Sequence, residues 1–242
     1  MIRDESSLRE FHYPDAAAFT LGVANVIRDA LRAALAERER ASVVVPGGST
    51  PGPVFDRLAS EELAGDDVDW SRVDITLSDE RWVPPTHADS NEALVRSRLL
   101  RGPATAARFL GLYRDLPRPS DAIVAVTHAL QSLARPFDVV LLGVGDDGHF
   151  ASLFPSRPEL ATALAMKSKD VLVALDSPAL GRPRISLNLA ALCDARRIML
   201  ALRGERKRAV LRQAFEPGCA ESLPLRALLR QTAAPVELHW SP

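Results

Sequence analysis

The stretch FDVVLLGVGDDGHFASLFP, residues 137–155, decides the fold. Residues 137–145 are the strongest strand signal in the chain, because such an apolar run is typical of a strand buried on both faces. The rest is a glycine-rich turn that carries two aspartates and a histidine. Ligands of open parallel sheets bind outside the carboxyl ends of the strands. The stretch therefore indicates a parallel sheet with a polar site at the end of one strand.

The glycines of this stretch also spell G-x-G-x-x-G, which occurs in dinucleotide-binding proteins. That motif needs a helix that begins inside it, and here Pro155 follows too soon for a long helix. Asp146 and Asp147 would also bring negative charge to the pyrophosphate. Asp176, at the end of a later strand, is the one feature that favours a dinucleotide, and titration with NADP and NAD tests it. We interpret the glycines as a tight turn that presents Asp147 and His149.

Short apolar runs and amphipathic segments alternate along the rest of the chain. The runs predict further strands at 42–46, 73–78, 107–112, 170–176, 184–187, 196–202 and 235–240. Apolar spacing and capping residues predict helices at 14–41, 50–63, 90–100, 120–133, 204–215 and 223–231. This alternation predicts an α/β fold, Rossmann-like, with a mostly parallel sheet and helices on both faces. No repeat or long linker divides the chain, so we expect a single domain, 1–242.

Composition narrows the class of protein. The 242 residues carry a net charge of −1, so no electrostatic case exists for nucleic acid or an anionic membrane as a partner. The two cysteines, Cys193 and Cys219, lie at no metal-ligand spacing, and we expect no metal. The first residues lack the apolar segment of a signal peptide, and no run of eighteen apolar residues occurs. We therefore expect a cytoplasmic protein.

Polar segments follow four of the predicted strands, and parallel strands bring their carboxyl ends to one edge. The first segment contains Gly47, Gly48, Ser49 and Thr50 before a helix that starts at Pro51. Glycine amides, hydroxyl groups and a helix N-terminus together suit a phosphate. The segment lacks the G-K-[ST] of a nucleoside triphosphate loop. A plain turn with Thr50 as the helix cap is the alternative.

The second segment packs Asp79, Glu80 and Arg81 against Trp82. An arginine here can clamp a phosphate, and an acid can hold a sugar hydroxyl or fix the arginine. A solvated charge run is the alternative interpretation. The following Val-Pro-Pro favours a fixed loop.

In the third segment, His149 suits a general base near neutral pH, and Asp147 can orient it. No serine or cysteine lies at a nucleophile elbow, so water would be the nucleophile. A structural, hydrogen-bonding histidine is the alternative. The fourth segment, with the strand before it, offers Lys207 and Arg184. A cation near a helix N-terminus is unfavourable unless a phosphate binds there, and a solvated lysine is the alternative.

Five segments in this order resemble the motif set of the 6-phosphogluconolactonases. They are PGGSTP (46–51), SDERWVP (78–84), GVGDDGHFASLFP (143–155), PRISL (183–187) and RGERKRAVL (203–211). The resemblance extends over residues 43–240. It implies an α/β enzyme of the oxidative pentose phosphate pathway that hydrolyses 6-phospho-D-glucono-1,5-lactone to 6-phosphogluconate. It implies no cofactor, no metal and no obligate protein partner, with the sugar-phosphate lactone as the bound small molecule.

The resemblance also implies roles for single residues. His149 corresponds to the family's base, supported by Asp147, and the phosphate contacts correspond to residues 47–50, Arg81, Arg184 and Lys207. The chain departs from the family at Phe150, where a threonine is usual, at Cys193, where an asparagine is frequent, and in 177–184, where a lysine is missing.

Two other functions use a similar fold. Glucosamine-6-phosphate deaminases share the DGH string, but continue with an IAFNEP-like string and have an MDEY-like acid motif. This chain reads FASLFP and SDERW, which favours the lactonase. A non-catalytic sugar-phosphate sensor would need a DNA-binding segment, for which the chain has no basic patch and no spare helix-turn-helix region.

Overall fold

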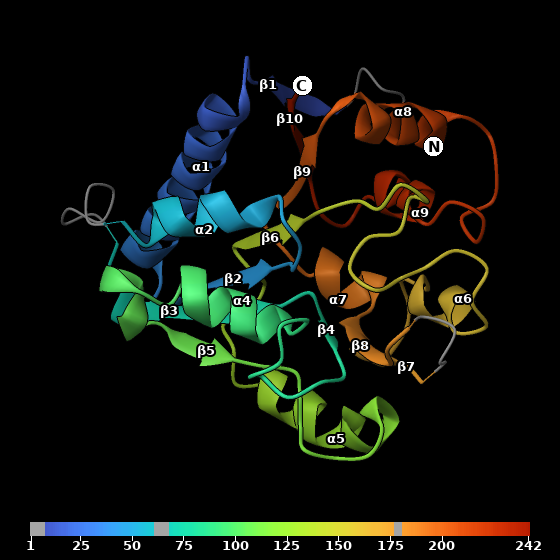
Figure 1. Ribbon diagram of the computed structural model, residues 1–242, viewed down its shortest axis with the longest axis horizontal. Helices are drawn as coiled ribbons and strands as arrows, with labels where there is room; N and C mark the ends of the chain where they lie inside the picture. Colours follow the sequence, from blue (N-terminus) through green and yellow to red (C-terminus); the bar gives the residue numbers. More distant parts are fainter. Residues whose placement is uncertain (1–7, 61–67, 177–180) are drawn as a thin grey trace.

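The computed structural model describes residues 8–60, 68–176 and 181–242. The strands are β1 Arg9–His12, β2 Ala41–Val45, β3 Val73–Leu77, β4 Asp79–Arg81, β5 Arg108–Leu110, β6 Val139–Leu142, β7 Leu172–Leu175, β8 Arg184–Leu187, β9 Ile198–Arg203 and β10 Val236–Ser241. The helices are α1 Ala16–Glu37, α2 Pro51–Leu58, α4 Asn91–Arg98, α5 Pro119–Leu130, α6 Leu160–Ala163, α7 Leu189–Cys193, α8 Glu205–Phe215 and α9 Leu225–Arg230. Short 3₁₀ turns occupy Trp70–Arg72 and Gly102–Ala106. Figure 1 shows these elements along the chain.

Seven strands form one parallel sheet in the order β1-β10-β9-β6-β2-β3-β5 (Figure 1). The chain builds this sheet in two directions from its middle. From β2 the sheet continues through β3 to β5, and from β6 it continues through β9 to β10. The adjacent strands β2 and β6 therefore form the point where the strand order reverses, which in parallel sheets is where ligands bind.

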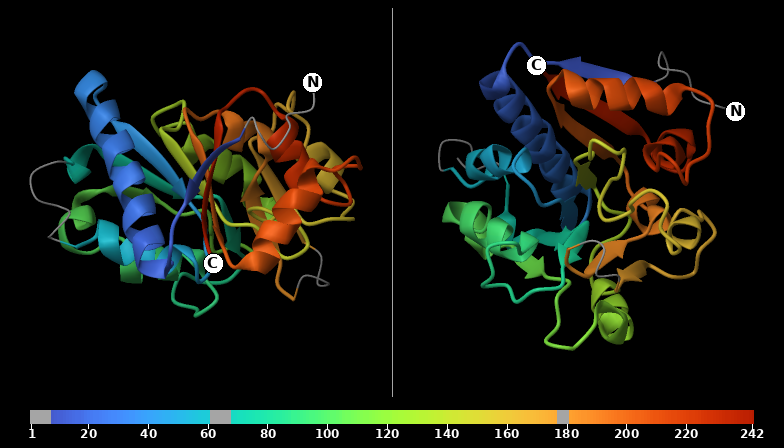
Figure 2. Two further views of the ribbon diagram at one scale, coloured as in Figure 1. Left: turned by 90° about the horizontal axis from the view of Figure 1, so that it is seen from above. Right: turned by 45° about the vertical axis from the view of Figure 1, so that its right-hand side comes forward.

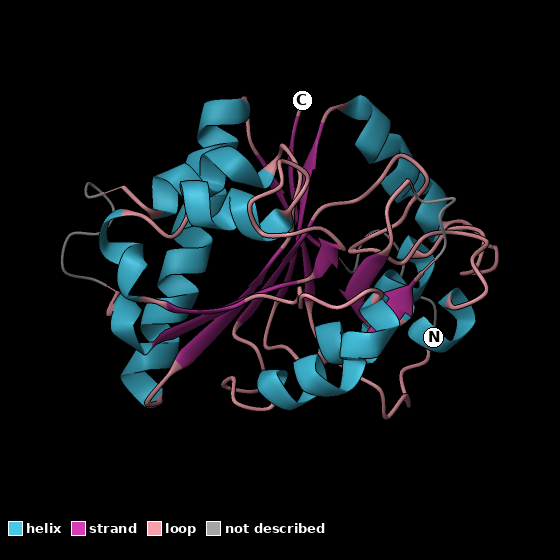
Figure 3. Ribbon diagram, turned by 60° about the horizontal axis from the view of Figure 1, so that its bottom comes forward, coloured by secondary structure: helices cyan, strands magenta, loops and turns pink. Residues whose placement is uncertain are grey.

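Helices cover both faces of the large sheet, which confirms the predicted fold class (Figure 3). Figure 2 shows α1 on one side of the sheet and α8 with α9 on the other. Strands β2, β3 and β6 are buried at every position, and β6 is apolar throughout, whereas β3 also buries the polar residues Asp74 and Thr76. The predicted helix at 50–63 is observed over Pro51–Leu58, and residues 61–63 lie outside the described part of the chain.

A second, antiparallel sheet was not predicted. Its order is β4-β8-β7, and its strands β7 and β8 fall in the segments 170–176 and 184–187, for which the sequence predicts strands. Strand β4 follows β3 after a single residue, and Arg81 of β4 lies opposite Arg184 of β8. The small sheet therefore brings three of the predicted site residues, Asp79, Arg81 and Arg184, to the carboxyl edge of the large one.

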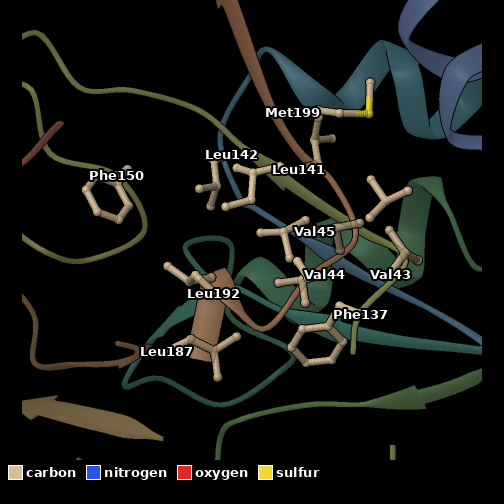
Figure 4. Packing of buried hydrophobic residues seen from close by; sticks show 14 of the residues in the cluster. Val43, Val44, Val45, Phe137, Leu141, Leu142, Phe150, Leu187, Leu192 and Met199 are labelled. Carbon is tan, nitrogen blue, oxygen red and sulfur yellow. The ribbon is translucent and has the colours of Figure 1, made fainter. Parts of the chain in front are cut away.

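Phe150 belongs to the hydrophobic core and not to the site. Its side chain is fully buried in the same cluster as Leu142 and Leu187 (Figure 4). Cys193 at the end of α7 is also buried, and burial raises the pKa of its thiol to about 12. These two departures from the family pattern thus concern apolar packing in the core. The third, the missing lysine in 177–184, lies partly outside the described residues.

Candidate active site

A cavity of about 300 Å³ lies at the carboxyl ends of β2 and β6, where the strand order reverses. Segments that follow β2, β6 and β9 form its walls, together with residues of the small sheet. The predicted residues that line it are Gly47, Gly48, Ser49, Thr50, Asp79, Arg81, His149, Arg184 and Lys207. Residues that are far apart in the sequence thus meet in one crevice. Asp147 and Glu80 are outside its lining.

Asp147 contacts His149 directly and lies outside the cavity lining. Oδ1 of Asp147 lies 2.5 Å from Nδ1 of His149 and also accepts a 3.2 Å hydrogen bond from the His149 backbone N–H. Burial alone raises the pKa of the Asp147 carboxyl, but the charge and hydrogen bonds of His149 outweigh it, and the pKa lies below its usual value. An ionised carboxylate only accepts hydrogen bonds, so Nδ1 carries a proton. This leaves Nε2 of His149 as the atom that can take a proton from a substrate or water.

Two glycines make this pairing possible. A Cβ atom on Gly145 would lie 2.1 Å from Nδ1 of His149 and 2.6 Å from Oδ1 of Asp147. Gly148 has a φ of +76°, a conformation that side chains with a Cβ rarely adopt. The backbone N–H of Gly145 donates to the carbonyl of His149 at 2.8 Å and closes the turn. The glycines of the G-x-G-x-x-G string therefore form a tight turn around the Asp147–His149 pair.

The turn after β2 forms another wall of the crevice. Gly48 has a φ of +97°, and the chain then enters α2 through Thr50, whose side chain makes no capping hydrogen bond. The alternative role of Thr50 as a side-chain cap is therefore not observed. The N-terminus of α2 faces the cavity with residues 47–51 in its lining, which suits an anionic group.

Arg81 and Arg184 form a cationic wall on the small sheet. They lie directly opposite each other across the β4–β8 ladder, and like charges in that position repel. Desolvation by burial lowers the pKa of Arg184, as does the charge of Arg81, although nearby Asp79 opposes both effects. The Nε atoms of both arginines are buried and make no hydrogen bond within the described residues. An anion bound between the two guanidinium groups would relieve this repulsion.

Asp79 lines the crevice but is itself almost fully buried. Its carboxylate accepts hydrogen bonds from Ser152 Oγ at 2.5 Å and Ser78 Oγ at 2.9 Å. Arg184 lies 4.0 Å away. Asp79 therefore connects the loop after His149 to the small sheet and provides a negative charge beside Arg184.

Glu80 requires a correction, because the structure places it away from the crevice. Its side chain is fully buried, and its carboxylate accepts hydrogen bonds from the backbone N–H groups of Arg81, Asn91 and Glu92 and from Ser90 Oγ. Burial raises its pKa, and these donors partly offset the increase. Glu80 holds the N-terminus of α4 and has no oxygen left to bind a sugar hydroxyl.

Lys207 lies at the third position of α8 and has a partner that the sequence did not predict. Its Nζ lies 2.9 Å from Oδ1 of Asp146, and Arg206 lies 3.6 Å from the same carboxylate. The Lys207 hydrogen bond lowers the pKa of Asp146. Asp146 thus offsets the unfavourable placement of a lysine near a helix N-terminus and keeps the ammonium group at the edge of the crevice.

Asn91 and Arg203 also line the cavity and were not predicted. Asn91 donates to the Asp79 carbonyl at 2.8 Å, and its amide occupies the space beside Gly47. Nothing in the helix-start sequence around Asn91 distinguishes it from an ordinary first-turn residue. Arg203 belongs to the polar segment RGERK after β9, which does indicate its position at the sheet edge.

Two further classes of site can be examined in the described residues. There, no three or more His, Cys, Asp or Glu side chains gather in a way that could hold a metal ion. None of the helices described has both the length and the apolar character needed to cross a bilayer.

Comparison with known proteins gives a consistent result. Residues 14–240 match the family described as glucosamine-6-phosphate isomerases/6-phosphogluconolactonase. A 6-phosphogluconolactonase of Pseudomonas aeruginosa is 41% identical over 227 residues, which cover 94% of this chain and 92% of the relative. One of Rhizobium meliloti is 38% identical over 237 residues, covering 98% and 99%.

Solved structures extend the comparison to the fold. A 6-phosphogluconolactonase from Shewanella baltica superposes with a TM-score of 0.92 at 38% identity, and the match covers 100% of both chains. A monomeric glucosamine-6-phosphate deaminase superposes with a TM-score of 0.78 at 16% identity, covering 97% of each chain. At that identity the deaminase shows the shared fold alone.

Proposed function

Because the chain belongs to the glucosamine-6-phosphate isomerase/6-phosphogluconolactonase family, we propose that it hydrolyses 6-phospho-D-glucono-1,5-lactone to 6-phosphogluconate with His149 as the general base. The Asp147–His149 pair, at the strand-order reversal and with His149 in the same cavity lining as the phosphate-binding groups, is the observation that carries this mechanism. The reaction is a step of the oxidative pentose phosphate pathway. We place it in the cytoplasm, without an obligate protein partner.

The phosphate end of the lactone binds first in this mechanism. The N-terminus of α2, with the 47–50 turn, offers amide and hydroxyl donors, and Arg81, Arg184 and Lys207 supply positive charge around the same cavity. Anchoring the phosphate fixes the sugar ring, so that C1 lies near His149 and the reaction becomes effectively unimolecular.

His149 then acts twice. Its Nε2 takes a proton from water while the water oxygen attacks C1, and the carbonyl electrons move onto the oxygen to give a tetrahedral oxyanion. When the oxyanion collapses, the bond between C1 and the ring oxygen breaks, and imidazolium returns the proton to that oxygen. Asp147, ionised and 2.5 Å from Nδ1, stabilises the imidazolium between these steps.

Replacement of His149 tests the mechanism. We expect His149→Ala to lower kcat by about 10²- to 10⁴-fold, the usual contribution of a general base, while KM changes little. The lactone is generated in situ from glucose 6-phosphate with its dehydrogenase, and unaided hydrolysis is subtracted. His128→Ala, on the exposed side of α5, is the matched control and should retain full activity.

Two results would contradict the proposal. A His149→Ala enzyme within threefold of the wild-type kcat would remove His149 from the role of base. Release of ammonia from glucosamine 6-phosphate by the wild type, without lactone hydrolysis, would place the chain with the deaminases.

A further inference from the structure

The chain reverses direction immediately after the base. Phe150 enters the core, Ala151 adopts a φ of +49°, and the Leu153 N–H donates to the Phe150 carbonyl at 3.0 Å. This turn returns the chain so that the ring of Phe154 packs against His149. The centroids of the two rings are 4.3 Å apart, with an angle of 41° between their planes.

The Phe154 ring restricts the imidazole of His149, which is otherwise held only by the hydrogen bond at Nδ1. Asp147 bonds Nδ1 of His149, and the imidazole could still pivot about that hydrogen bond. An aromatic ring against its side removes this freedom and fixes the direction of Nε2. The π face also favours the imidazolium that forms during the reaction.

The same phenyl ring contacts a second functional side chain. The guanidinium carbon of Arg184 lies 5.3 Å from the centroid of Phe154, within the range of cation–π attraction. Arg184 has little else to hold it, because Asp79 is 4.0 Å away and its buried Nε has no partner among the described atoms. His149 and Arg184 line the crevice, and Phe154 lies outside the lining.

We propose that Phe154 is a positioning residue that sets the distance between the base His149 and the anion-binding Arg184. The inference rests on the proposed function, in which His149 acts at C1 and Arg184 binds the 6-phosphate. A ring that contacts both side chains couples phosphate anchoring to the direction of Nε2. Phe154 therefore determines how strongly the enzyme prefers a 6-phosphorylated lactone to an unphosphorylated one.

Phe154→Leu removes the aromatic ring and keeps an apolar side chain. We expect kcat for the phosphorylated lactone to fall by about 10- to 100-fold, the effect of a small misplacement of reacting groups. The ratio of kcat/KM for 6-phosphogluconolactone to that for glucono-1,5-lactone should fall as well, since Arg184 also loses its support. Phe154→Tyr keeps the aromatic face and should restore most of both quantities.

Phe150→Leu is the matched control, because it removes a phenyl ring from the same turn, but from the buried side. It should lower the midpoint of thermal unfolding and leave kcat and the substrate ratio unchanged at temperatures where it is folded. A Phe154→Leu enzyme with wild-type kcat and ratio would overturn the proposal. Equal losses in Phe150→Leu and Phe154→Leu would overturn it too, because they would indicate a general disturbance of the turn.

A second measurement separates this inference from the proposed function. The Nδ1 nitrogen resonance of His149, assigned by its loss in His149→Ala, reports the hydrogen bond to Asp147 and is little affected by the ring current of Phe154; it should move in Phe154→Leu and stay in place in Phe150→Leu. If the wild type does not hydrolyse the lactone but the resonance moves as expected, the proposed function fails and the positioning role stands. If the resonance does not move, the positioning role fails whatever the activity.

Discussion

His149 and Phe150 are neighbours in the sequence and lie in opposite environments. The imidazole of His149 lines the crevice, while the ring of Phe150 is fully buried beneath it. A bulky residue after the base is therefore compatible with the site, because its side chain is directed into the core. At this scale the glycines matter most, since they decide where the functional side chains can meet.

Gly145 illustrates this with a testable consequence. In Gly145→Ala the new Cβ would lie 2.1 Å from Nδ1 of His149, so the imidazole must leave its place beside Asp147. We expect kcat to fall by about 100-fold, because the base is displaced by an ångström or more. Steady-state kinetics and urea unfolding of the same preparation measure activity and stability together.

Gly22→Ala is a matched control for this substitution. Its Cβ would lie 2.1 Å from the ring of Tyr13, a clash of the same size at a position remote from the crevice. It should destabilise the fold by about 1–3 kcal/mol and leave kcat unchanged. A Gly145→Ala enzyme with normal kcat would show that the Asp147–His149 contact is not required.

At the scale of elements, the sequence is informative where burial is local and continuous. Strands β2 and β6 could be predicted because their runs of valine and leucine directly indicate burial, and β3 because its valine, isoleucine, threonine and leucine favour a strand despite Asp74. Strand β4 could not be predicted, because its sequence, Asp-Glu-Arg, is charged and it is a strand only through pairing with β8 more than a hundred residues later. The role of Glu80 was hidden for the same reason, since its donors come from the start of α4.

Asp74 is a buried charge near the start of β3, at the end of the strand opposite the crevice, and it connects β3 to its neighbours. Its carboxylate accepts hydrogen bonds from Arg40, Arg108 and the Ala134 N–H, and so joins β3 to β5 and to the residues next to β2 and α5. Burial alone raises the pKa of Asp74, but these hydrogen bonds outweigh it, and the pKa lies below its usual value.

Asp74→Asn removes the charge that two arginines share. We expect the free energy of unfolding at pH 7 to fall by about 3 kcal/mol. Because the folded-state pKa of Asp74 is lowered, its contribution is fully present above the unfolded value of about 4 and is lost as pH falls through the folded value. The difference in the free energy of unfolding between wild type and Asp74→Asn, measured by urea unfolding, should therefore become smaller as pH decreases from 7 to 3.

An exposed aspartate provides the control. Asp29 on α1 has a half-exposed side chain, and Asp29→Asn should change the free energy of unfolding by no more than about 0.5 kcal/mol at either pH. A difference between wild type and Asp74→Asn that is constant from pH 7 to pH 3 would contradict the assigned role.

At the scale of the whole molecule, the crevice depends on two sheets being held together. The segments that follow strands β2, β6 and β9 of the large sheet contain the α2 N-terminus, His149 and Lys207. Strands β4 and β8 of the small sheet contain Arg81 and Arg184. The position of the crevice could be predicted from the rule for parallel strands. The facing arginines could not, since their register depends on the β4–β8 ladder.

This arrangement predicts that the reaction product stabilises the folded protein through its phosphate. At about 100 times its Kd, 6-phosphogluconate should add about 2.7 kcal/mol to the free energy of unfolding. For a chain of this size that corresponds to a rise in Tm of about 5–10 °C. Gluconate has the same carbon chain without the phosphate and should raise Tm little at the same concentration.

Two arginine variants test which group binds the phosphate. In Arg81→Gln the rise in Tm with 6-phosphogluconate should be smaller than in the wild type. Arg118 forms an exposed ion pair away from the crevice, and Arg118→Gln should respond like the wild type. Equal shifts with gluconate and 6-phosphogluconate would mean that the cationic wall does not bind the phosphate, and the anchoring step of the mechanism would have to be assigned to other groups.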